Sequence, residues 1–204
     1  MSRYLGPKHK LCRRLGVKVC DAAKCPLMRR NYPPGMHGPN ARVRLTPYGQ
    51  QFREKQRARR TYGLTERQFS NYYHAAVSEK GDSGVHLARM LEMRLDNVVY
   101  RLHWALTRPQ ARQLVGHGFV QVNGKRVDVP SYQVRLKDVI AIKENKRGKK
   151  FFSDKAGRPA EKQGIPEWLN VETDGFQAKV IGQPEPELLK GLFNAQAVVE
   201  LYSR

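Results

Sequence analysis

The chain has 204 residues, 40% of them hydrophobic, and a formal net charge of +20 at pH 7 with a pI near 10.2. This length allows one or two domains with buried cores, and the hydrophobic content excludes a chain that is disordered throughout. The strong positive charge indicates a polyanionic partner. It is concentrated at one end, because residues 1–60 hold 16 Lys and Arg residues against 2 acidic residues.

The sequence excludes further classes of protein. It has no run of about eighteen apolar residues, so we expect no membrane-spanning helix and no membrane partner. Its start lacks the apolar stretch of a secretory signal. Three cysteines grouped near the start argue against a secreted disulfide scaffold and for an intracellular protein.

Residues 1–45 are rich in Gly, Pro and basic residues and show little periodicity. One interpretation is a disordered basic arm, because such a segment buries too little surface to offset its ordering entropy. The other is an arm that becomes ordered on nucleic acid, since Tyr4, Tyr32 and His37 alternate with arginines and suit contacts with bases and sugars.

The same segment holds the constellation His9-x2-Cys12-x7-Cys20-x4-Cys25. Three thiols and an imidazole are the ligand types of a tetrahedral zinc site, which would stabilise a segment too small to fold alone. The alternative is that Cys20 is a small buried apolar residue and His9 an RNA contact.

From residue 46 the pattern predicts two consecutive helices. Thr46 is placed to cap the first, with Pro47 in its first turn, and Gly63 ends it. Thr65 and Gln68 form a capping pair for the second helix. Its predicted core consists of Phe69, Tyr72, Tyr73 and Ala76.

The first of these helices has a basic face. Arg53, Arg57 and Arg60 recur at helical spacing, so a phosphate backbone could run along them. A solvated helix surface is the alternative, but such surfaces usually carry both signs of charge, and here Glu54 is the single counter-charge.

Residues 91–142 have the clearest organisation, and residues 81–84 are predicted to be the loop before them. Apolar residues at three- and four-residue steps predict one helix face. They are Leu91, Leu95, Val98, Val99, Leu102 and Leu106. Thr107 is placed to cap a second helix, with Pro109 in its first turn and glycines 116 and 118 at its end.

The period then changes to two. Val120 and Val122 alternate with polar residues, and Asn123-Gly124 is typical of a type I′ hairpin turn. The helix before this hairpin carries Arg108 and Arg112 beside glycines, which together offer charge and backbone N–H groups to phosphates. We therefore interpret residues 91–142 as an RNA-binding module.

Beyond residue 142 the chain is basic and rich in turns. Residues 143–158 are predicted to be a flexible loop, or else a basic hairpin that touches RNA. Trp168 is expected to anchor a short turn, and alternation at Phe176, Ala178 and Val180 predicts a final strand. An amphipathic helix from Leu188 to the end is expected to pack in the core.

Several blocks resemble a known family. RLDNVVYRL, TRPQARQLVGHG and VNGKRVDVPSYQV resemble the RNA-binding domain named after small-subunit ribosomal protein four. RRNYPPGMHG, YGQQFREKQRARRTYGLTERQF, PEWL and VVELYSR resemble bacterial or organellar members of the ribosomal protein family itself, uS4. The blocks fall in the family's order and reach both ends of the chain.

The resemblance implies an α+β fold, in which a mainly helical domain carries an inserted RNA-binding domain of helices packed on a small antiparallel sheet. The implied divisions are a basic, irregular N-terminal arm at 1–45, a helical domain at 46–90 completed by 188–204, and an insert at 91–187 with a core module at 94–157.

The resemblance also implies the function. It indicates a structural constituent of the small ribosomal subunit that binds 16S-type rRNA early, nucleates 30S assembly and contributes to translational accuracy with ribosomal protein five. The implied partners are rRNA, neighbouring ribosomal proteins and mRNA where it enters the subunit. The implied location is the ribosome, in the cytoplasm.

RNA-contacting residues are implied in three parts of the chain. In the module they are Arg108, Gln110, Arg112, Gln113, His117 and Lys125; in the helical domain Tyr48, Arg53, Lys55, Gln56 and Arg59; in the arm Arg3, Arg13, Arg14, Arg29 and Arg30.

Some family members hold zinc with four cysteines in the arm, and here His9 stands where the first cysteine is expected. The implied cofactor is one structural zinc on His9, Cys12, Cys20 and Cys25.

The same module also occurs in RNA-modifying enzymes and in an RNA chaperone, which are the alternatives. The enzymes carry a separate catalytic domain, whereas this sequence has no glycine-rich phosphate loop and no nucleophile–base pair. Asp96 in RLDN resembles part of a pseudouridine synthase motif but lies on the module's own predicted helix. The chaperones lack the helical block at 46–69. We therefore expect no enzymatic activity.

Overall fold

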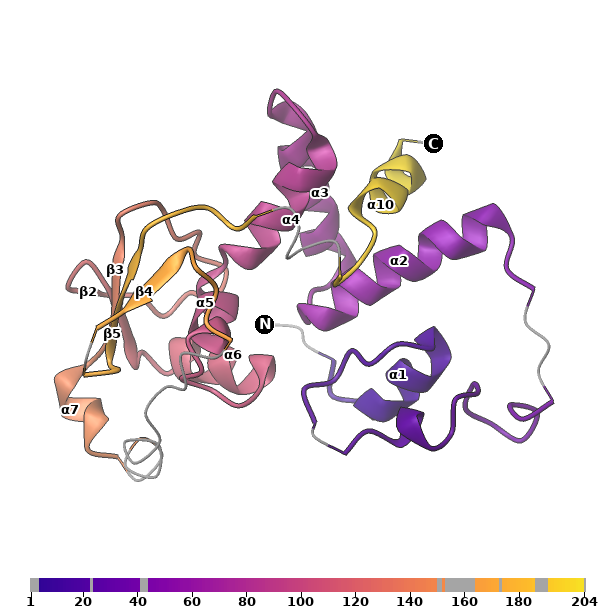
Figure 1. The fold of residues 1–204 in the computed structure, drawn as a ribbon, viewed down its shortest axis with the longest axis horizontal. Coiled ribbons are helices and arrows are strands. Elements are labelled where there is room, and N and C mark those ends of the chain that lie inside the picture. The colour runs from indigo at the N-terminus through magenta and orange to yellow at the C-terminus, as the bar shows by residue number, and fades with distance from the viewer. Residues whose placement is uncertain are drawn as a thin grey trace. The chain divides into compact units, whose positions relative to one another are not determined.

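The computed structural model describes residues 4–22, 24–40, 44–149, 152, 164–172, 174–185 and 191–203. The chain forms two compact units (Figure 1). Unit 1 comprises Met1–Ala88 together with Pro186–Arg204, and unit 2 comprises Arg89–Glu185. Within the described ranges, no helix is long and apolar enough to cross a membrane.

The arm has a small core of its own. It contains α1 (Lys8–Leu15) and the short 3-10 helix η1 (Pro26–Met28). Cys12, Cys20, Cys25 and Leu27 are buried together between these elements. The chain leaves α1 through Gly16, whose φ of 69° lies in the left-handed region that favours glycine. The arm is thus ordered around its cysteines.

The two helices predicted after residue 46 are present. Helix α2 (Pro47–Thr61) begins at Thr46, whose hydroxyl accepts a hydrogen bond from the Gly49 N–H at 3.2 Å. Helix α3 (Glu66–Ser78) begins with the predicted capping box of Thr65 and Gln68. Gly63 separates the helices with a φ of 65°. Of the predicted core residues, Phe69, Tyr73 and Ala76 are buried, and Tyr72 is half-buried.

Helix α10 (Ala195–Tyr202) packs against α2. Its N-cap Asn194 has an extended backbone, and its side chain accepts a hydrogen bond from Ala197. The Asn194 N–H donates to Glu54 at 2.7 Å, and the preceding Phe193 is 1% exposed. The prediction of a helix running from Leu188 is wrong for residues 191–194, which are not helical and which contact α2 through Asn194. Residues 186–190 lie outside the described ranges.

The single helix predicted over residues 91–106 is wrong. The chain forms α4 (Ser83–Glu92) and α5 (Leu95–Arg101), and Arg94 between them is extended and bridges to Gln133. The Leu95 N–H donates to the Tyr132 carbonyl at 2.9 Å, so distant backbone interrupts the helix. Leu106 is 65% exposed and not part of an apolar face.

The loop predicted at 81–84 ends earlier than expected. Gly84 already lies in α4, because the Asp82 carboxylate accepts hydrogen bonds from the N–H groups of Gly84 and Val85 at 2.8 and 3.3 Å. An Asp side chain that satisfies the first N–H groups of a helix is a strong start signal.

Unit 2 contains α6 and a five-stranded sheet. Helix α6 (Arg108–Gly116) is capped by Thr107 as predicted, and Gly118 follows it with a φ of 68°. The strands are β1 (Val120–Val122), β2 (Lys125–Arg126), β3 (Val139–Ile142), β4 (Leu169–Val171) and β5 (Gln177–Val180). Their order is β2-β1-β3-β5-β4, and all neighbours are antiparallel.

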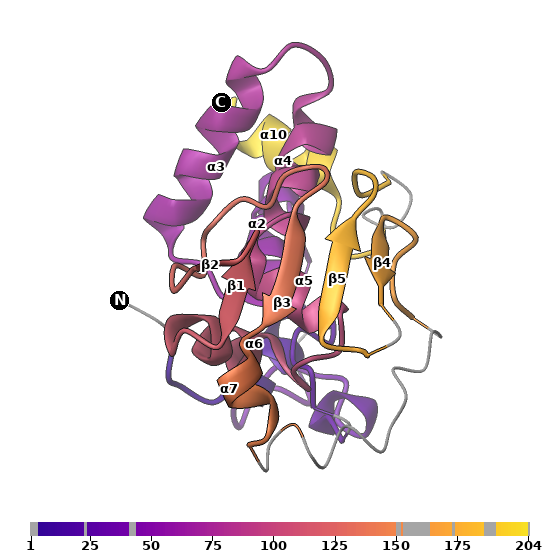
Figure 2. The same cartoon turned by 90° about the vertical axis from the view of Figure 1, so that its left-hand side faces the viewer.

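One face of this sheet packs on α5 and α6 (Figure 2). The core combines strand residues at alternate positions with apolar residues of the two helices. From the sheet it takes Val120, Val122, Ile140, Ile142, Ala178 and Val180. Trp168 is 5% exposed in the same core, as predicted. The α+β fold class expected from the resemblance is confirmed.

The hairpin turn after β1 was predicted correctly, whereas the basic segment after β3 was not. Asn123 and Gly124 both have positive φ, at 50° and 76°, as a type I′ turn requires. The segment expected to be a loop begins instead with the helical turn α7 (Glu144–Arg147). The Arg147 guanidinium lies 5.5 Å from the centre of the Phe176 ring, which anchors α7 to the unit.

Candidate nucleic-acid interface and metal cluster

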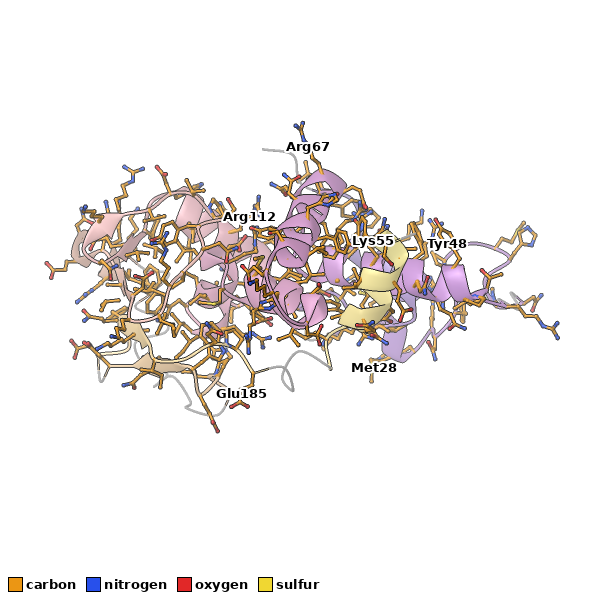
Figure 3. All side chains as sticks on the ribbon, turned by 90° about the horizontal axis from the view of Figure 1, so that it is seen from above. Met28, Tyr48, Lys55, Arg67, Arg112 and Glu185 are labelled. Atoms are coloured by element: carbon orange, nitrogen blue, oxygen red, sulfur yellow. The ribbon has the colours of Figure 1, made fainter. Side chains whose placement is uncertain are left out.

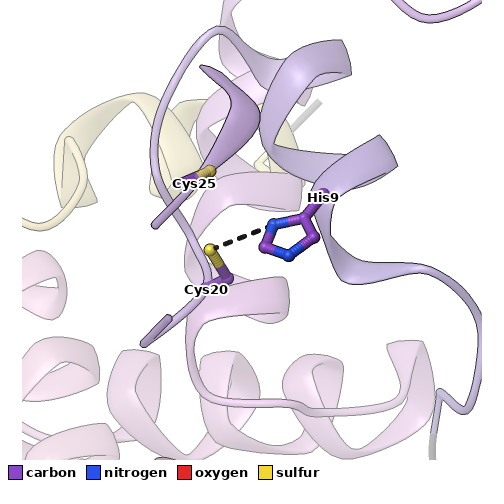
Figure 4. Close-up of side chains that lie close together, drawn as sticks. All are labelled: His9, Cys20 and Cys25. Atoms are coloured by element: carbon purple, nitrogen blue, oxygen red, sulfur yellow. Dashed lines mark hydrogen bonds between the residues drawn. The ribbon is translucent and has the colours of Figure 1, made fainter. Parts of the chain in front are cut away.

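Three of the four predicted metal ligands come together in the arm (Figure 4). The ligand atoms of His9, Cys20 and Cys25 all lie within 4.8 Å of one another. The Cys20 Sγ is 3.7 Å from His9 Nδ1. The fourth predicted ligand, Cys12, is fully buried and packs in the same small core as Cys20 and Cys25, but it is not part of this close group.

The spacing of His9 and Cys20 fits two ligands of a tetrahedral zinc ion. Zinc–sulfur and zinc–nitrogen bonds of about 2.3 and 2.0–2.1 Å place the two ligand atoms about 3.6 Å apart. The observed separation of Cys20 Sγ and His9 Nδ1 is 3.7 Å. The donor set of three thiols and one imidazole is also a set that zinc uses.

The two thiols nearest His9 differ in acidity. Burial raises the pKa of Cys20 to about 11, and hydrogen bonds with Cys12 and Cys25 add to the increase although the backbone of Ala22 opposes it. Burial also acts to raise the pKa of Cys25, but hydrogen bonds from Leu27, Cys20 and Cys12 outweigh it, so the pKa of Cys25 is lowered. Of these two thiols, Cys25 therefore ionises first, and a bound cation would favour ionisation of Cys20 as well.

Helix α2 exposes two aromatic side chains near its start. Tyr48 is 56% exposed and Phe52 is 40% exposed. Their ring centres are 6.2 Å apart with an angle of 21° between the planes. The Lys55 ammonium lies 4.9 Å from the Phe52 ring centre. The sequence interpretation missed Phe52, although its spacing of four residues from Tyr48 on a predicted helix was an available signal.

Two predicted RNA contacts on α2 are held by a carboxylate. Lys55 Nζ and Arg59 Nη1 each lie 2.7 Å from Glu66, and the Tyr202 hydroxyl donates to Glu66 at 2.7 Å. The side chains of Lys55 and Arg59 are only 12% and 14% exposed. Their charges are thus partly neutralised within the protein. We call Lys55, Arg59, Glu66 and Tyr202 the Glu66 cluster.

The Glu66 cluster alters the acidity of its members. Burial acts to raise the pKa of Glu66, but hydrogen bonds from Lys55 and Tyr202 and the charges of Lys55 and Arg59 outweigh it, so the pKa is lowered. Burial raises the pKa of Tyr202, and the hydrogen bond and negative charge of Glu66 raise it further.

The predicted basic face of α2 is only partly directed to solvent. Arg57 donates to the Gly191 carbonyl at 3.0 Å and lies 3.5 Å from Glu54. The Arg60 guanidinium lies over the Tyr4 ring at 4.8 Å, and burial and the Arg59 charge lower its pKa. Arg53 is half-buried and forms no hydrogen bond or ion pair with other described residues. The three side chains therefore do not form one uniform phosphate-binding row.

In unit 2, α6 carries the predicted arginines, and Figure 3 marks Arg112. Arg112 donates to Asp96 at 3.1 Å, and Arg108 donates to Asn97 at 3.0 Å. Gln110 has a structural role, because its side-chain oxygen accepts a hydrogen bond from the Leu106 N–H at 2.9 Å. The remaining predicted residues of this unit, Gln113, His117 and Lys125, are exposed.

The arginines of the arm also divide into those bonded within the protein and those exposed to solvent. Arg13 donates to the carbonyl oxygens of Tyr32 and Pro33, each at 3.1 Å, and so fixes that segment to α1. Arg14, Arg29 and Arg30 are exposed, and Gln56 on α2 is half-buried. Arg3 lies outside the described residues. Exposed cations that the sequence interpretation missed include Lys8, Lys10, Arg44 and Arg67.

Comparison with known proteins bears directly on this arrangement. Residues 3–92 match the family described as "Ribosomal protein S4/S9 N-terminal domain", and residues 93–140 match the "S4 domain". Over 210 aligned residues and the whole of both chains, the protein is 44% identical to small ribosomal subunit protein uS4 of Thermoanaerobacter sp. (strain X514). It is 45% and 46% identical, again over both whole chains, to the uS4A proteins of Clostridium perfringens (strain SM101 / Type A) and Clostridium botulinum (strain ATCC 19397 / Type A).

These matches confirm the resemblance seen in the sequence blocks. They cover both units and both ends of the chain, whereas a protein that shared only the RNA-binding module would match over its middle part alone. The chain therefore belongs to the family of small ribosomal subunit protein uS4.

Proposed function

We propose that the protein is a structural, non-enzymatic component of the small ribosomal subunit and binds its rRNA through exposed cations of both units and the arm. The observation that carries this proposal is the full-length similarity to uS4 proteins, together with exposed basic side chains on α1, α3 and the β1–β2 hairpin. A member of this family works in the cytoplasm, on the ribosome. Phosphate contacts from Lys and Arg supply most of such binding energy.

The finer proposal is that it binds 16S-type rRNA early, nucleates 30S assembly and acts on translational accuracy beside ribosomal protein five, near mRNA where it enters the subunit. We further propose that the arm at 1–45, the helical domain at 46–90 with 188–204, and the insert at 91–187 act as separate functional domains. The separation of the insert from the rest is supported by the two compact units, of which unit 2 covers Arg89–Glu185, whereas the arm and the helical domain lie together in unit 1.

The direct test compares the full chain on small-subunit rRNA, on large-subunit rRNA of similar length, and in ribosome fractions. The protein should sediment with small subunits and whole ribosomes, and it should bind small-subunit rRNA more tightly than the control RNA at equal salt. Equal affinity for the two RNAs, with no association with small subunits, would overturn the proposal.

We propose that His9, Cys12, Cys20 and Cys25 hold one structural zinc. The ion would link α1 to the segment around η1, so its contribution is to the stability of the arm. Elemental analysis of the purified chain should give about one zinc per molecule, with loss in Cys12→Ser and retention in His9→Cys, which restores a thiol ligand. Addition of a chelator should lower the melting temperature of the wild type but not of Cys12→Ser. Equal, negligible zinc in wild type and Cys12→Ser would contradict the assignment.

A further inference from the structure

A buried polar network joins α5 to α6 in unit 2. Asp96 and Asn97 are 6% and 2% exposed. Asp96 accepts two hydrogen bonds from Arg94, at 3.1 and 2.9 Å, and one from Arg112 at 3.1 Å. The Asn97 side-chain oxygen accepts from Arg108 Nε at 3.0 Å. Consecutive residues of α5 therefore bind the two arginines that α6 carries one turn apart.

The network continues on the other side of Asn97. Its side-chain amide donates to the Glu92 carboxylate at 2.9 Å, and Arg101 donates twice to the same carboxylate, each time at 2.9 Å. Glu92 is 2% exposed and Arg94 1% exposed. Charges buried to this degree require partners, and well-packed apolar residues are often equally stabilising. Stability alone is thus a weak reason for this network.

The network fixes the guanidinium groups of Arg108 and Arg112 on α6. A hydrogen bond to a carboxylate or amide oxygen restricts the plane of a guanidinium. The Arg108 guanidinium also lies 4.3 Å above the centre of the Tyr100 ring, which holds it on a second side. Side-chain freedom that is lost before RNA arrives does not have to be lost on binding, so affinity increases.

We propose that Asp96, Asn97 and Tyr100 are positioning residues for RNA binding, holding Arg112 and Arg108 in the orientation in which α6 offers them to phosphates. This inference rests on the proposed function, in which those arginines contact rRNA. In this role the negatively charged Asp96 increases the affinity for RNA, because the affinity gained by orienting Arg112 exceeds the affinity lost by repulsion between Asp96 and phosphates. The Coulomb effect alone would give the opposite sign.

A double-mutant cycle in the full chain tests this sign and its route. Asp96→Asn keeps the side-chain shape but cannot accept from Arg94 and Arg112 at both former oxygen positions. We expect it to lower affinity for small-subunit rRNA roughly three- to tenfold, although it removes a negative charge, and to cause no further loss in an Arg112→Ala background. The circular dichroism spectrum and the melting temperature of each variant are also measured, to show that it is folded.

The outcomes separate the two proposals. If the wild type does not prefer small-subunit rRNA, the proposed function fails. Two results would show that only the positioning role is wrong. One is that Asp96→Asn binds small-subunit rRNA more tightly than the wild type. The other is that Asp96→Asn lowers the affinity by the same factor in the wild-type and Arg112→Ala backgrounds. Normal binding by Arg112→Ala would also overturn the role, since the arginine that Asp96 holds would then not contact RNA.

A second pair of variants keeps the inference testable should Asp96→Asn fail to fold. Tyr100→Leu removes the ring below Arg108, whereas Tyr100→Phe retains it. We expect Tyr100→Leu to weaken binding about threefold, Tyr100→Phe to retain it, and the difference to disappear in an Arg108→Ala background. A loss for Tyr100→Leu that persists without Arg108 would contradict the positioning role of Tyr100.

Discussion

Tyr48 and Phe52 expose their rings to solvent one turn apart on α2, beside the Lys55 ammonium. An aromatic ring at a basic surface offers a flat apolar face on which an unpaired base can stack. Such stacking depends little on base identity and little on salt. It therefore complements the phosphate contacts expected from the arginines.

At this scale we predict that Phe52→Ala weakens binding to small-subunit rRNA by about fivefold or more, since loss of one stacked base costs about 1–3 kcal/mol. Phe52→Tyr should retain most of the affinity. The matched control is Val77→Ala near the end of α3, because Val77 is an apolar side chain of similar exposure, 48%, and is not among the proposed RNA contacts. Filter-binding titrations at two salt concentrations give the measurement; equal affinities for Phe52→Ala and Val77→Ala would contradict an RNA contact at this ring.

The types of residue in the interface could be predicted from the sequence, but their orientation could not. Arg13 and Arg14 are neighbours in the chain, yet Arg13 turns to carbonyl groups 19 and 20 positions away while Arg14 is exposed. Lys55 and Arg59 are similarly held by Glu66 on the next helix. The grouping of His9, Cys20 and Cys25 was easier to predict, because side-chain type and spacing are local properties of the sequence.

At the scale of elements, the Glu66 cluster joins α2, α3 and α10. Tyr202 on α10 stacks on Tyr73 of α3 with ring centres 4.6 Å apart, and its hydroxyl donates to Glu66. Because the pKa of folded Glu66 is lowered, its contribution to stability is present above the unfolded pKa of about 4.3 and is lost as pH falls through the folded pKa.

We predict that Glu66→Gln lowers the melting temperature at pH 7 and makes it fall less steeply between about pH 5 and pH 3 than in the wild type. Thermal unfolding followed by circular dichroism at several pH values measures this. Glu185→Gln, at an exposed position in unit 2, is the control and should keep the wild-type slope. Parallel slopes for Glu66→Gln and wild type would show that the cluster does not stabilise the fold through the Glu66 charge.

Local signals account for the elements that the sequence predicted well. Thr107, Pro109 and Gly118 define α6 within a dozen residues, and Asn123-Gly124 fixes the hairpin by itself. The break between α4 and α5 had no such signal, because apolar residues keep helical spacing across Arg94. Its cause lies almost forty residues later, at Tyr132 and Gln133.

Over the whole molecule, charge is concentrated in the first sixty residues, with 16 basic against 2 acidic residues. The logarithm of the rRNA affinity should therefore fall linearly with the logarithm of salt concentration, by about 0.7–0.9 per phosphate contact. We predict that Arg53→Ala reduces this slope by roughly one contact in titrations from about 50 to about 300 mM salt. A slope near zero for the wild type would exclude phosphate contacts as the main source of affinity.

The pairing of α10 with α2 and α3 also fixes an order of events during synthesis. Tyr202 reaches Glu66 across 136 positions of the chain, and Arg89–Glu185, which lie between them in the sequence, form unit 2. Unit 2 is one continuous segment, so its whole sequence is made before that of α10. Helices α2 and α3, which are made early, therefore obtain their partner α10 only at the end of synthesis.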